Sequence, residues 1–272
     1  MSKGIDSITH EAWIETAIRA AIAAGAEILS VYETTFDVEL KDDRTPLTIA
    51  DKKAHKVIVE KLQSTALPVL SEEGREIPYS ERKKWTRFWM VDPLDGTKEF
   101  IKRNGEFTVN IALIENGRAV SGVIYVPVLR DLYFALSGNG AFKIQNPDIS
   151  FFSIRDLMTE SNKLPFPQKQ NRPFTVVGSR SHQSPDTKKY MEELQQRHGK
   201  IEIVSMGSSL KICLVAAGDA DIYPRFAPTM EWDTAAGHAI AKEAGKEIYD
   251  HTTGKPMVYN KENLLNNWFI VS

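Results

Sequence analysis

The stretch RFWMVDPLDGTKEF, residues 87–100, runs a hydrophobic segment directly into two carboxylates. Its FWMV portion has the residue types of a buried strand. Asp92 and Asp95 follow, with a proline between them. Residues three apart on a regular strand point to opposite faces, so these acids converge only if the chain turns between them. Pro93 favours a turn because it fixes its own φ at about −65° and keeps Asp92 extended.

This turn would gather oxygen ligands for a hard cation. Gly96 allows the backbone to approach a ligand closely, and the turn directs the Leu94 carbonyl outward beside the two carboxylates. Mg²⁺ prefers such a set of oxygens. The same residue types also build exposed surface turns, so the motif alone leaves both interpretations open.

Two further acids occupy settings that we interpret as strand ends: Glu72 in VLSEEG and Asp233 in MEWDTAAG. If all four acids converge, each pair at ~4 Å repels by about 4 kcal/mol at an effective dielectric of about 20. A domain with ~5–15 kcal/mol of net stability does not tolerate that without compensation. Either the acids lie apart or cations lie among them, and we favour cations. Trp232, beside Asp233, is expected in the core or on the wall of this site.

Composition narrows the class of protein. The chain has 272 residues, 42% of them hydrophobic, which suits one large domain or two compact ones. Its net charge of −2 gives no general attraction to nucleic acid or anionic membranes. The single cysteine, Cys213, excludes a disulfide framework and is expected as a buried thiol. We expect no cleavable signal at the N-terminus, and we expect its charged residues to prevent it from crossing a bilayer. We expect a cytoplasmic protein and leave open peripheral attachment to the inner membrane.

The pattern predicts two halves. Residues 1–150 are expected to form an α+β domain with an antiparallel sheet, beginning with helices over 9–32 and 51–62. Two hairpins follow, over 107–126 and 132–144, and Asn116-Gly117 is a strong turn signal for the first. A polar, proline-containing connection over 146–172 holds the boundary. Strands and helices alternate in residues 151–272, which predicts an α/β domain carrying Asp233.

Three motifs in order, SEEG, VDPLDGTKEF and WDTAAG, resemble those of the lithium-sensitive, metal-dependent phosphatase superfamily that contains the inositol monophosphatases. Within it the chain is most similar to the 3'(2'),5'-bisphosphate nucleotidases of the bacterial CysQ type. GSSLKICLVA and YPRFAPTMEWDTAAGHAI extend the resemblance along the chain. Lys98-Glu99 and the lysine of GSSLK depart from inositol monophosphatases and favour a nucleotide substrate. The resemblance implies a layered αβαβα sandwich.

The resemblance also implies a site with two or three Mg²⁺ ions. Asp51 matches the family's base position and Thr97 its hydroxyl partner, so both are expected to activate a water. Backbone N–H groups of Gly96 and Thr97 would hold the phosphate. The implied metal ligands are Glu72, Asp92, the Leu94 carbonyl, Asp95 and Asp233.

A nucleoside bisphosphate requires a second anion site. Family-matching positions suggest basic and hydroxyl side chains for it, although each of these residues also suits a solvated surface. The full set expected to contact substrate is Glu72, Asp95, Gly96, Thr97, Lys98, His182, Ser208, Lys211, Arg225 and Asp233.

The expected reaction is Mg²⁺-dependent hydrolysis of adenosine 3',5'-bisphosphate to AMP and phosphate, with 3'-phosphoadenylyl sulfate as a further substrate, linked to sulfate assimilation. One alternative is an inositol (poly)phosphate phosphatase with the same metal site. Another is a non-catalytic nucleotide sensor, which the water-activating pair Asp51 and Thr97 argues against. We expect a small-molecule partner, neither nucleic acid nor an integral membrane contact, and a monomer or homodimer.

Overall fold

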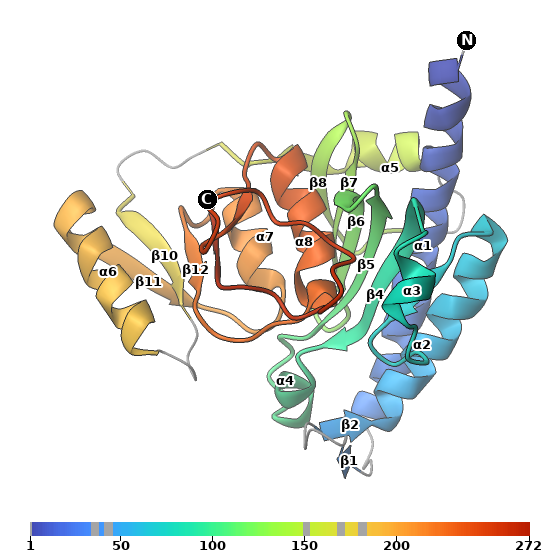
Figure 1. Ribbon diagram of the computed structural model, residues 1–272, viewed down its shortest axis with the longest axis horizontal. Helices are drawn as coiled ribbons and strands as arrows, with labels where there is room; N and C mark the ends of the chain where they lie inside the picture. Colours follow the sequence, from blue (N-terminus) through green and yellow to red (C-terminus); the bar gives the residue numbers. More distant parts are fainter. Residues whose placement is uncertain (1, 34–37, 41–45, 149–152, 168–171, 179–183) are drawn as a thin grey trace.

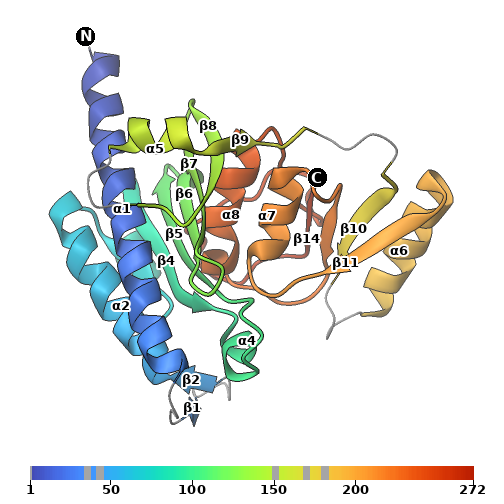
Figure 2. The same cartoon turned by 180° about the vertical axis from the view of Figure 1, so that it is seen from behind.

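Helices and sheets form successive layers in the computed structural model (Figures 1 and 2). The structure describes residues 2–33, 38–40, 46–148, 153–167, 172–178 and 184–272. Within these residues no helix is both long and apolar enough to span a membrane.

A seven-stranded sheet is the central scaffold. Its strands follow chain order, and only the β3–β4 pair is parallel. Short helices α3 (Tyr79–Arg82) and α4 (Thr97–Ile101) flank β4 in sequence. The strands are β3 (Val69–Ser71), β4 (Arg87–Asp95), β5 (Thr108–Glu115), β6 (Arg118–Val126), β7 (Asp131–Leu136), β8 (Gly140–Gln145) and β9 (Asn162–Leu164).

Helices α1 (Ser2–Tyr32) and α2 (Ile49–Leu62) cover one face of the sheet. The pair β1 (Val38–Leu40) and β2 (Pro46–Thr48) precedes α2, and a 3₁₀ turn (Gln63–Thr65) ends it. Trp89 and Val91 of β4 pack into this layer, whereas Phe88 and Met90 pack into the opposite one. Because both faces of β4 are buried, its hydrophobic run is continuous instead of alternating with polar residues.

Helices α7 (Leu210–Ala217) and α8 (Glu231–Glu243) cover the other face. Small residues allow α8 to lie very close to the sheet. A Cβ added at Gly122 of β6 would come within 2.4 Å of the Ala236 carbonyl oxygen. The start of α8 is therefore fixed against the sheet that carries β4.

The outer layers come from the C-terminal part of the chain. Strand β10 (Phe174–Gly178) pairs in parallel with β11 (Ile201–Ser205), and α6 (Pro185–His198) lies outside them. Strand β14 (Phe269–Val271) lies between β12 (Tyr223–Arg225) and β13 (Ile248–Asp250). An isolated bridge from Val176 to Ile222 connects the two groups. The arrangement confirms the αβαβα sandwich.

The hairpin prediction is confirmed at Asn116-Gly117, where φ is 50° and 73° and Glu115 pairs with Arg118. Residues 146–172 hold more structure than the expected loose connection. Helix α5 (Ile154–Glu160) packs beside α1, where Glu15 accepts from the Ile154 N–H at 2.7 Å. Strand β9 then extends the large sheet. The division into domains at residue 150 stays a prediction.

Candidate active site

Asp92 and Asp95 converge because β4 contains a bulge. Asp92 pairs with Asn110 of β5 and Asp95 pairs with Thr108, so β4 advances three residues while β5 advances two. The extra residue reverses the facing of the second acid. The turn expected between the acids is therefore a bulge inside a strand that continues to Asp95. Gly96 follows at φ 93°, a conformation that favours glycine.

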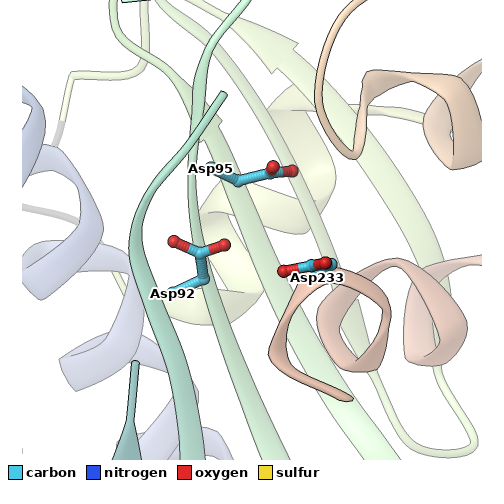
Figure 3. Close-up of side chains that lie close together, drawn as sticks. All are labelled: Asp92, Asp95 and Asp233. Carbon is cyan, nitrogen blue, oxygen red and sulfur yellow. The ribbon is translucent and has the colours of Figure 1, made fainter. Parts of the chain in front are cut away.

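Asp233 reaches the same space from α8. It lies in the first helical turn, so the expectation that it ends a strand is wrong. Ligand oxygens of Asp92, Asp95 and Asp233 all lie within 4.8 Å of one another. Figure 3 shows the three carboxylates facing a common space, two from β4 and one from α8.

Backbone N–H groups orient all three carboxylates. Leu94 N donates to Asp92 Oδ1 at 3.1 Å, and Met230 N donates to Asp233 Oδ2 at 2.9 Å. Asp95 Oδ2 accepts from Ser209 N at 2.6 Å, and each acid retains a second oxygen for a ligand.

The electrostatics of the cluster favour a cation. Burial raises the pKa of Asp92 well above its usual range, and the Glu72, Asp95, Asp233 and Asp51 carboxylates raise it further. Burial, reinforced by Asp95, has the same effect on the pKa of Asp233. Burial also raises the pKa of Asp95, against the opposing effect of Lys211. Crowded, desolvated carboxylates are ionised together only when positive charge compensates them. These residues fit a hard divalent ion.

The expected metal ligands share one cavity of about 400 Å³, the acidic cavity. Glu72 enters it from the turn after β3, where Glu72 N donates to Val91 O at 3.1 Å. Trp232 also lines the cavity while packing against the core, so both expectations for it hold. The expected ligands on its wall are Glu72, Asp92, Leu94, Asp95 and Asp233.

Of the expected water-activating pair, Thr97 lines this cavity and Asp51 does not. The Thr97 hydroxyl donates to Leu94 O at 3.4 Å. Asp51 is buried in the first turn of α2, near enough to Asp92 to raise its pKa. Cooperation of Asp51 with Thr97 stays a prediction.

A second cavity of about 430 Å³, the basic cavity, adjoins the first. Lys98, Ser208, Lys211 and Arg225 line it, as expected for a second anion site. The residues that line both cavities are Asp95, Gly96, Lys98, Glu99, Thr229 and Asp233.

The cations of the basic cavity are held by carbonyl oxygens. Lys211 Nζ donates to Met206 O and Arg225 Nη2 donates to Pro228 O, each at 3.3 Å. Burial lowers the pKa of Lys211 to about 8, with Asp95 opposing that shift. His182, the remaining expected contact, lies outside the described residues.

Sequence reasoning missed a buried polar group that supports Asp95. Asn110 Nδ2 donates to Asp95 Oδ2 at 3.4 Å, and Ser209 Oγ donates to Asn110 Oδ1 at 2.8 Å. Thr108 Oγ1 donates to the same Asn110 oxygen at 3.0 Å. A signal existed, since Asn110 interrupts the buried run of β5 with an amide that requires partners.

Comparison with known proteins now identifies the family. The family model described as the inositol monophosphatase family matches residues 9–268. The chain belongs to the inositol monophosphatase family. This membership confirms the resemblance inferred from the three acidic motifs.

The relatives bear a common name. The 3'(2'),5'-bisphosphate nucleotidase CysQ of Escherichia coli K12 is 47% identical over 92% of this chain and 95% of its own length. The protein of that name from Salmonella typhimurium is 46% identical, covering 95% of this chain and 99% of its own length.

Solved structures agree with the fold. The crystal structure of CysQ from Bacteroides thetaiotaomicron is 53% identical and has a TM-score of 0.87, with 94% of this chain and 95% of that chain covered. The SuhB protein of Bartonella henselae is more distant, at 27% identity and a TM-score of 0.71, with 96% and 93% covered.

Proposed function

We propose that this chain is a Mg²⁺-dependent 3'(2'),5'-bisphosphate nucleotidase that hydrolyses the 3'-phosphate of adenosine 3',5'-bisphosphate to AMP and inorganic phosphate. The observation that carries the proposal is that the acidic cavity shares a wall with a cavity that Lys98, Lys102, Lys211 and Arg225 line. One cavity suits the metal ions of phosphate-ester hydrolysis and the other suits a second phosphate. The name shared by relatives at 46–47% identity, 3'(2'),5'-bisphosphate nucleotidase, supports the substrate class.

The acidic cavity would hold two or three Mg²⁺ ions through Glu72, Asp92, the Leu94 carbonyl, Asp95 and Asp233. Bound Mg²⁺ supplies charge neutralisation for the phosphate ester and acidifies water. The hydrogen bonds from backbone N–H groups hold the three aspartates in place before any ligand arrives. Preorganisation of this kind lowers the reorganisation needed during reaction.

The residues of the chain then direct a water at the phosphorus. Thr97 would orient that water through its hydroxyl, and Asp51 would accept the proton. The new bond joins water oxygen to phosphorus, and the bond that breaks joins phosphorus to the 3' oxygen of the ribose, which leaves as a hydroxyl after taking a proton from solvent water. The proposal involves no covalent phosphoenzyme.

Lys211 and Arg225 would hold the 5'-phosphate, with Lys98 and Ser208 beside them. Charge-assisted hydrogen bonds to a doubly charged phosphate are among the stronger polar contacts in proteins. An inositol monophosphate carries no second phosphate for these cations, so the basic cavity favours a bisphosphate. The same contacts accept the 5' end of 3'-phosphoadenylyl sulfate.

The test is phosphate release from adenosine 3',5'-bisphosphate, 3'-phosphoadenylyl sulfate, 3'-AMP, 5'-AMP and inositol 1-phosphate, each with Mg²⁺ and with EDTA. We expect Mg²⁺-dependent turnover of the two 3',5'-substituted nucleotides, with kcat/KM well above that of the monophosphates. Equal or faster release from inositol 1-phosphate would overturn the substrate assignment but leave the roles of the acids. No release from any compound would overturn the reaction and favour a nucleotide sensor.

A further inference from the structure

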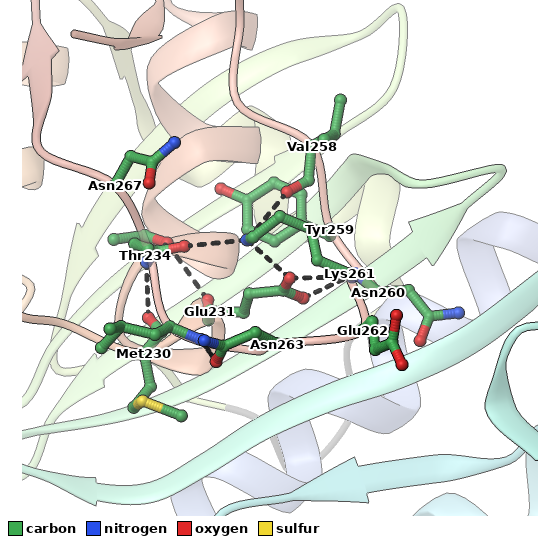
Figure 4. A network of polar contacts seen from close by, with 12 residues as sticks. Met230, Glu231, Thr234, Val258, Tyr259, Asn260, Lys261, Glu262, Asn263 and Asn267 are labelled. Carbon is green, nitrogen blue, oxygen red and sulfur yellow. Dashed lines mark hydrogen bonds and ion pairs between the residues drawn. The ribbon is translucent and has the colours of Figure 1, made fainter. Parts of the chain in front are cut away.

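A buried ionic group at the start of α8 takes no part in the chemistry proposed above. Glu231 is the first residue of α8 and is 0% exposed. Asn260 N donates to its Oε2 at 2.6 Å. Lys261 donates twice to its Oε1, from the backbone N at 3.0 Å and from Nζ at 2.7 Å. Figure 4 shows the Glu231 carboxylate facing residues 260 and 261.

Arg82 of α3 holds the same segment from its other side. Its guanidinium donates to Asn260 Oδ1 at 2.9 Å and to Glu262 O at 2.7 Å, and also to the Lys261 carbonyl. Asn260 Nδ2 returns a hydrogen bond to Arg82 O at 2.8 Å. Residues 260–262, which we name the bridge, therefore connect α3 to α8 through part-buried hydrogen bonds to two buried side chains, Arg82 and Glu231.

The bridge ends beside the acidic cavity. Asp233 lies two residues after Glu231, in the same helical turn. The neighbouring segment secures this turn further, because Asn266 Nδ2 donates to Met230 O at 2.7 Å and Leu264 O accepts from Glu231 N at 2.9 Å. Helix α3 leads directly into β4, which carries Asp92 and Asp95.

A buried carboxylate and guanidinium are costly to desolvate, and apolar residues could fill such a position instead. Charged groups with several hydrogen bonds instead fix the relative positions of the segments that they join, because charge-assisted hydrogen bonds are short and directional. The acidic cavity is where fixed geometry has a use, since ligand oxygens of a divalent ion tolerate little displacement.

We propose that Arg82 and Glu231 are positioning residues that set the separation between Asp233 and the β4 carboxylates, and thereby the affinity of the acidic cavity for a divalent cation. The inference rests on the proposed function only in requiring that the cavity binds such a cation. Neither residue lines either of the two cavities.

The experiment measures Mn²⁺ binding to the full chain by electron paramagnetic resonance of free Mn²⁺, without substrate. The variants are Arg82→Met, Glu231→Gln and the double variant. Arg87→Met is the control, because it removes the same side-chain type from a part-buried contact, the 2.6 Å ion pair of Arg87 with Glu115 at the far end of β4. Thermal unfolding of each variant is followed in parallel.

We expect Arg82→Met and Glu231→Gln each to raise the Kd for Mn²⁺ by about 10-fold or more, as loss of outer support does at other metal sites. The Kd of the double variant for Mn²⁺ should be no higher than that of the single variant with the larger effect, because both side chains act through the same residues 260–262. Arg87→Met should keep the wild-type Kd even where its unfolding midpoint falls equally. Turnover of Arg82→Met should recover at high Mg²⁺.

Wild-type Mn²⁺ affinity in folded Arg82→Met, or equal weakening in Arg87→Met, would overturn the positioning role and leave the proposed function standing. Absence of Mn²⁺ binding to the wild type would overturn both. Should Arg82→Met fail to fold, Lys261→Met takes its place. It retains both backbone donors to Glu231, its side chain is 31% exposed, and we expect it to raise the Kd several-fold.

Discussion

The acidic and basic cavities adjoin, yet the chain holds their charged groups in different ways. In the acidic cavity, Asp92, Asp95 and Asp233 are each oriented by a backbone N–H group, on a strand and a helix packed against one another. In the basic cavity, the charges of Lys211 and Arg225 lie at the ends of long side chains, each bonded to a carbonyl oxygen at 3.3 Å.

The two kinds of support indicate that the acidic cavity needs more accurate placement of its charged groups than the basic cavity does. Metal ligands must be placed accurately, and backbone donors on regular elements supply that. A phosphate bound by long cationic side chains needs less precise placement, because the ammonium and guanidinium groups follow it through changes of side-chain rotamer. Changes in the acidic cavity should therefore impair turnover of every substrate, whereas changes in the basic cavity should alter the choice among substrates.

The largest effect is expected from Asp95→Asn. Loss of a carboxylate between the two cavities should lower kcat by about 10³-fold or more for all substrates, because metal charge stabilisation is worth several kcal/mol. Asp51→Ala should reduce kcat similarly if it accepts the proton. Steady-state kinetics checks both, with Glu115→Gln as the control, because Glu115 pairs with Arg87 at the end of β4 remote from Asp95. Wild-type turnover by either variant would remove that residue from the mechanism.

Asp92→Asn should stabilise the metal-free protein. Burial, then Glu72, raises the pKa of Asp92. A folded pKa above the unfolded value means that the folded state binds more protons, so this contribution to stability falls as pH rises. We expect the variant to be more stable than wild type by about 2–4 kcal/mol at pH ~8, with the gap closing towards pH ~4. Urea unfolding in EDTA measures the gap, and a gap independent of pH would contradict this account. Mg²⁺ should reverse the order.

Lys211→Met should lower kcat/KM for the bisphosphate much more than for a 3'-monophosphate. Loss of a charge-assisted hydrogen bond worth about 1.5–3 kcal/mol predicts a fall of about 10- to 150-fold in kcat/KM for adenosine 3',5'-bisphosphate. Turnover of 3'-AMP, which lacks the 5'-phosphate, should change little. Parallel losses on both compounds would mean that the two cavities are not functionally distinct.

The smallest expected effect is a pH dependence confined to the basic cavity. Burial lowers the pKa of Lys211 to about 8, so its charge is present below that pH and is lost above it. KM for the bisphosphate should rise up to tenfold per pH unit above about 8, with no matching rise for 3'-AMP. Lys211→Arg keeps its charge and should abolish this rise, so a profile unchanged in that variant would assign the titration to another group.

The sequence was most informative where local chemistry determines geometry. Asn116-Gly117 required positive φ at both positions and forms the expected hairpin turn. Each acid lies near one end of an element: Glu72 follows β3, Asp92 and Asp95 lie in the last residues of β4, and Asp233 lies in the first turn of α8. Local signals of this type do not depend on distant parts of the chain.

Features that depend on pairing across the chain escaped prediction. The bulge in β4 is defined only by its register with β5, and Pro93 alone indicated a turn. The support of Asp95 by Ser209 joins residues 114 positions apart. Likewise Arg82 and Asn260 are separated by 178 positions, and nothing local to either one signals the contact.

The close approach of α8 to the sheet at Gly122 restricts which residues can occupy that position. The Ala236 carbonyl, one turn beyond Asp233, would lie 2.4 Å from any Cβ at position 122. A methyl group at this position would force α8 away from the sheet and would displace the Asp233 carboxylate with the helix. Position 122 therefore requires glycine so that α8 can approach the sheet closely.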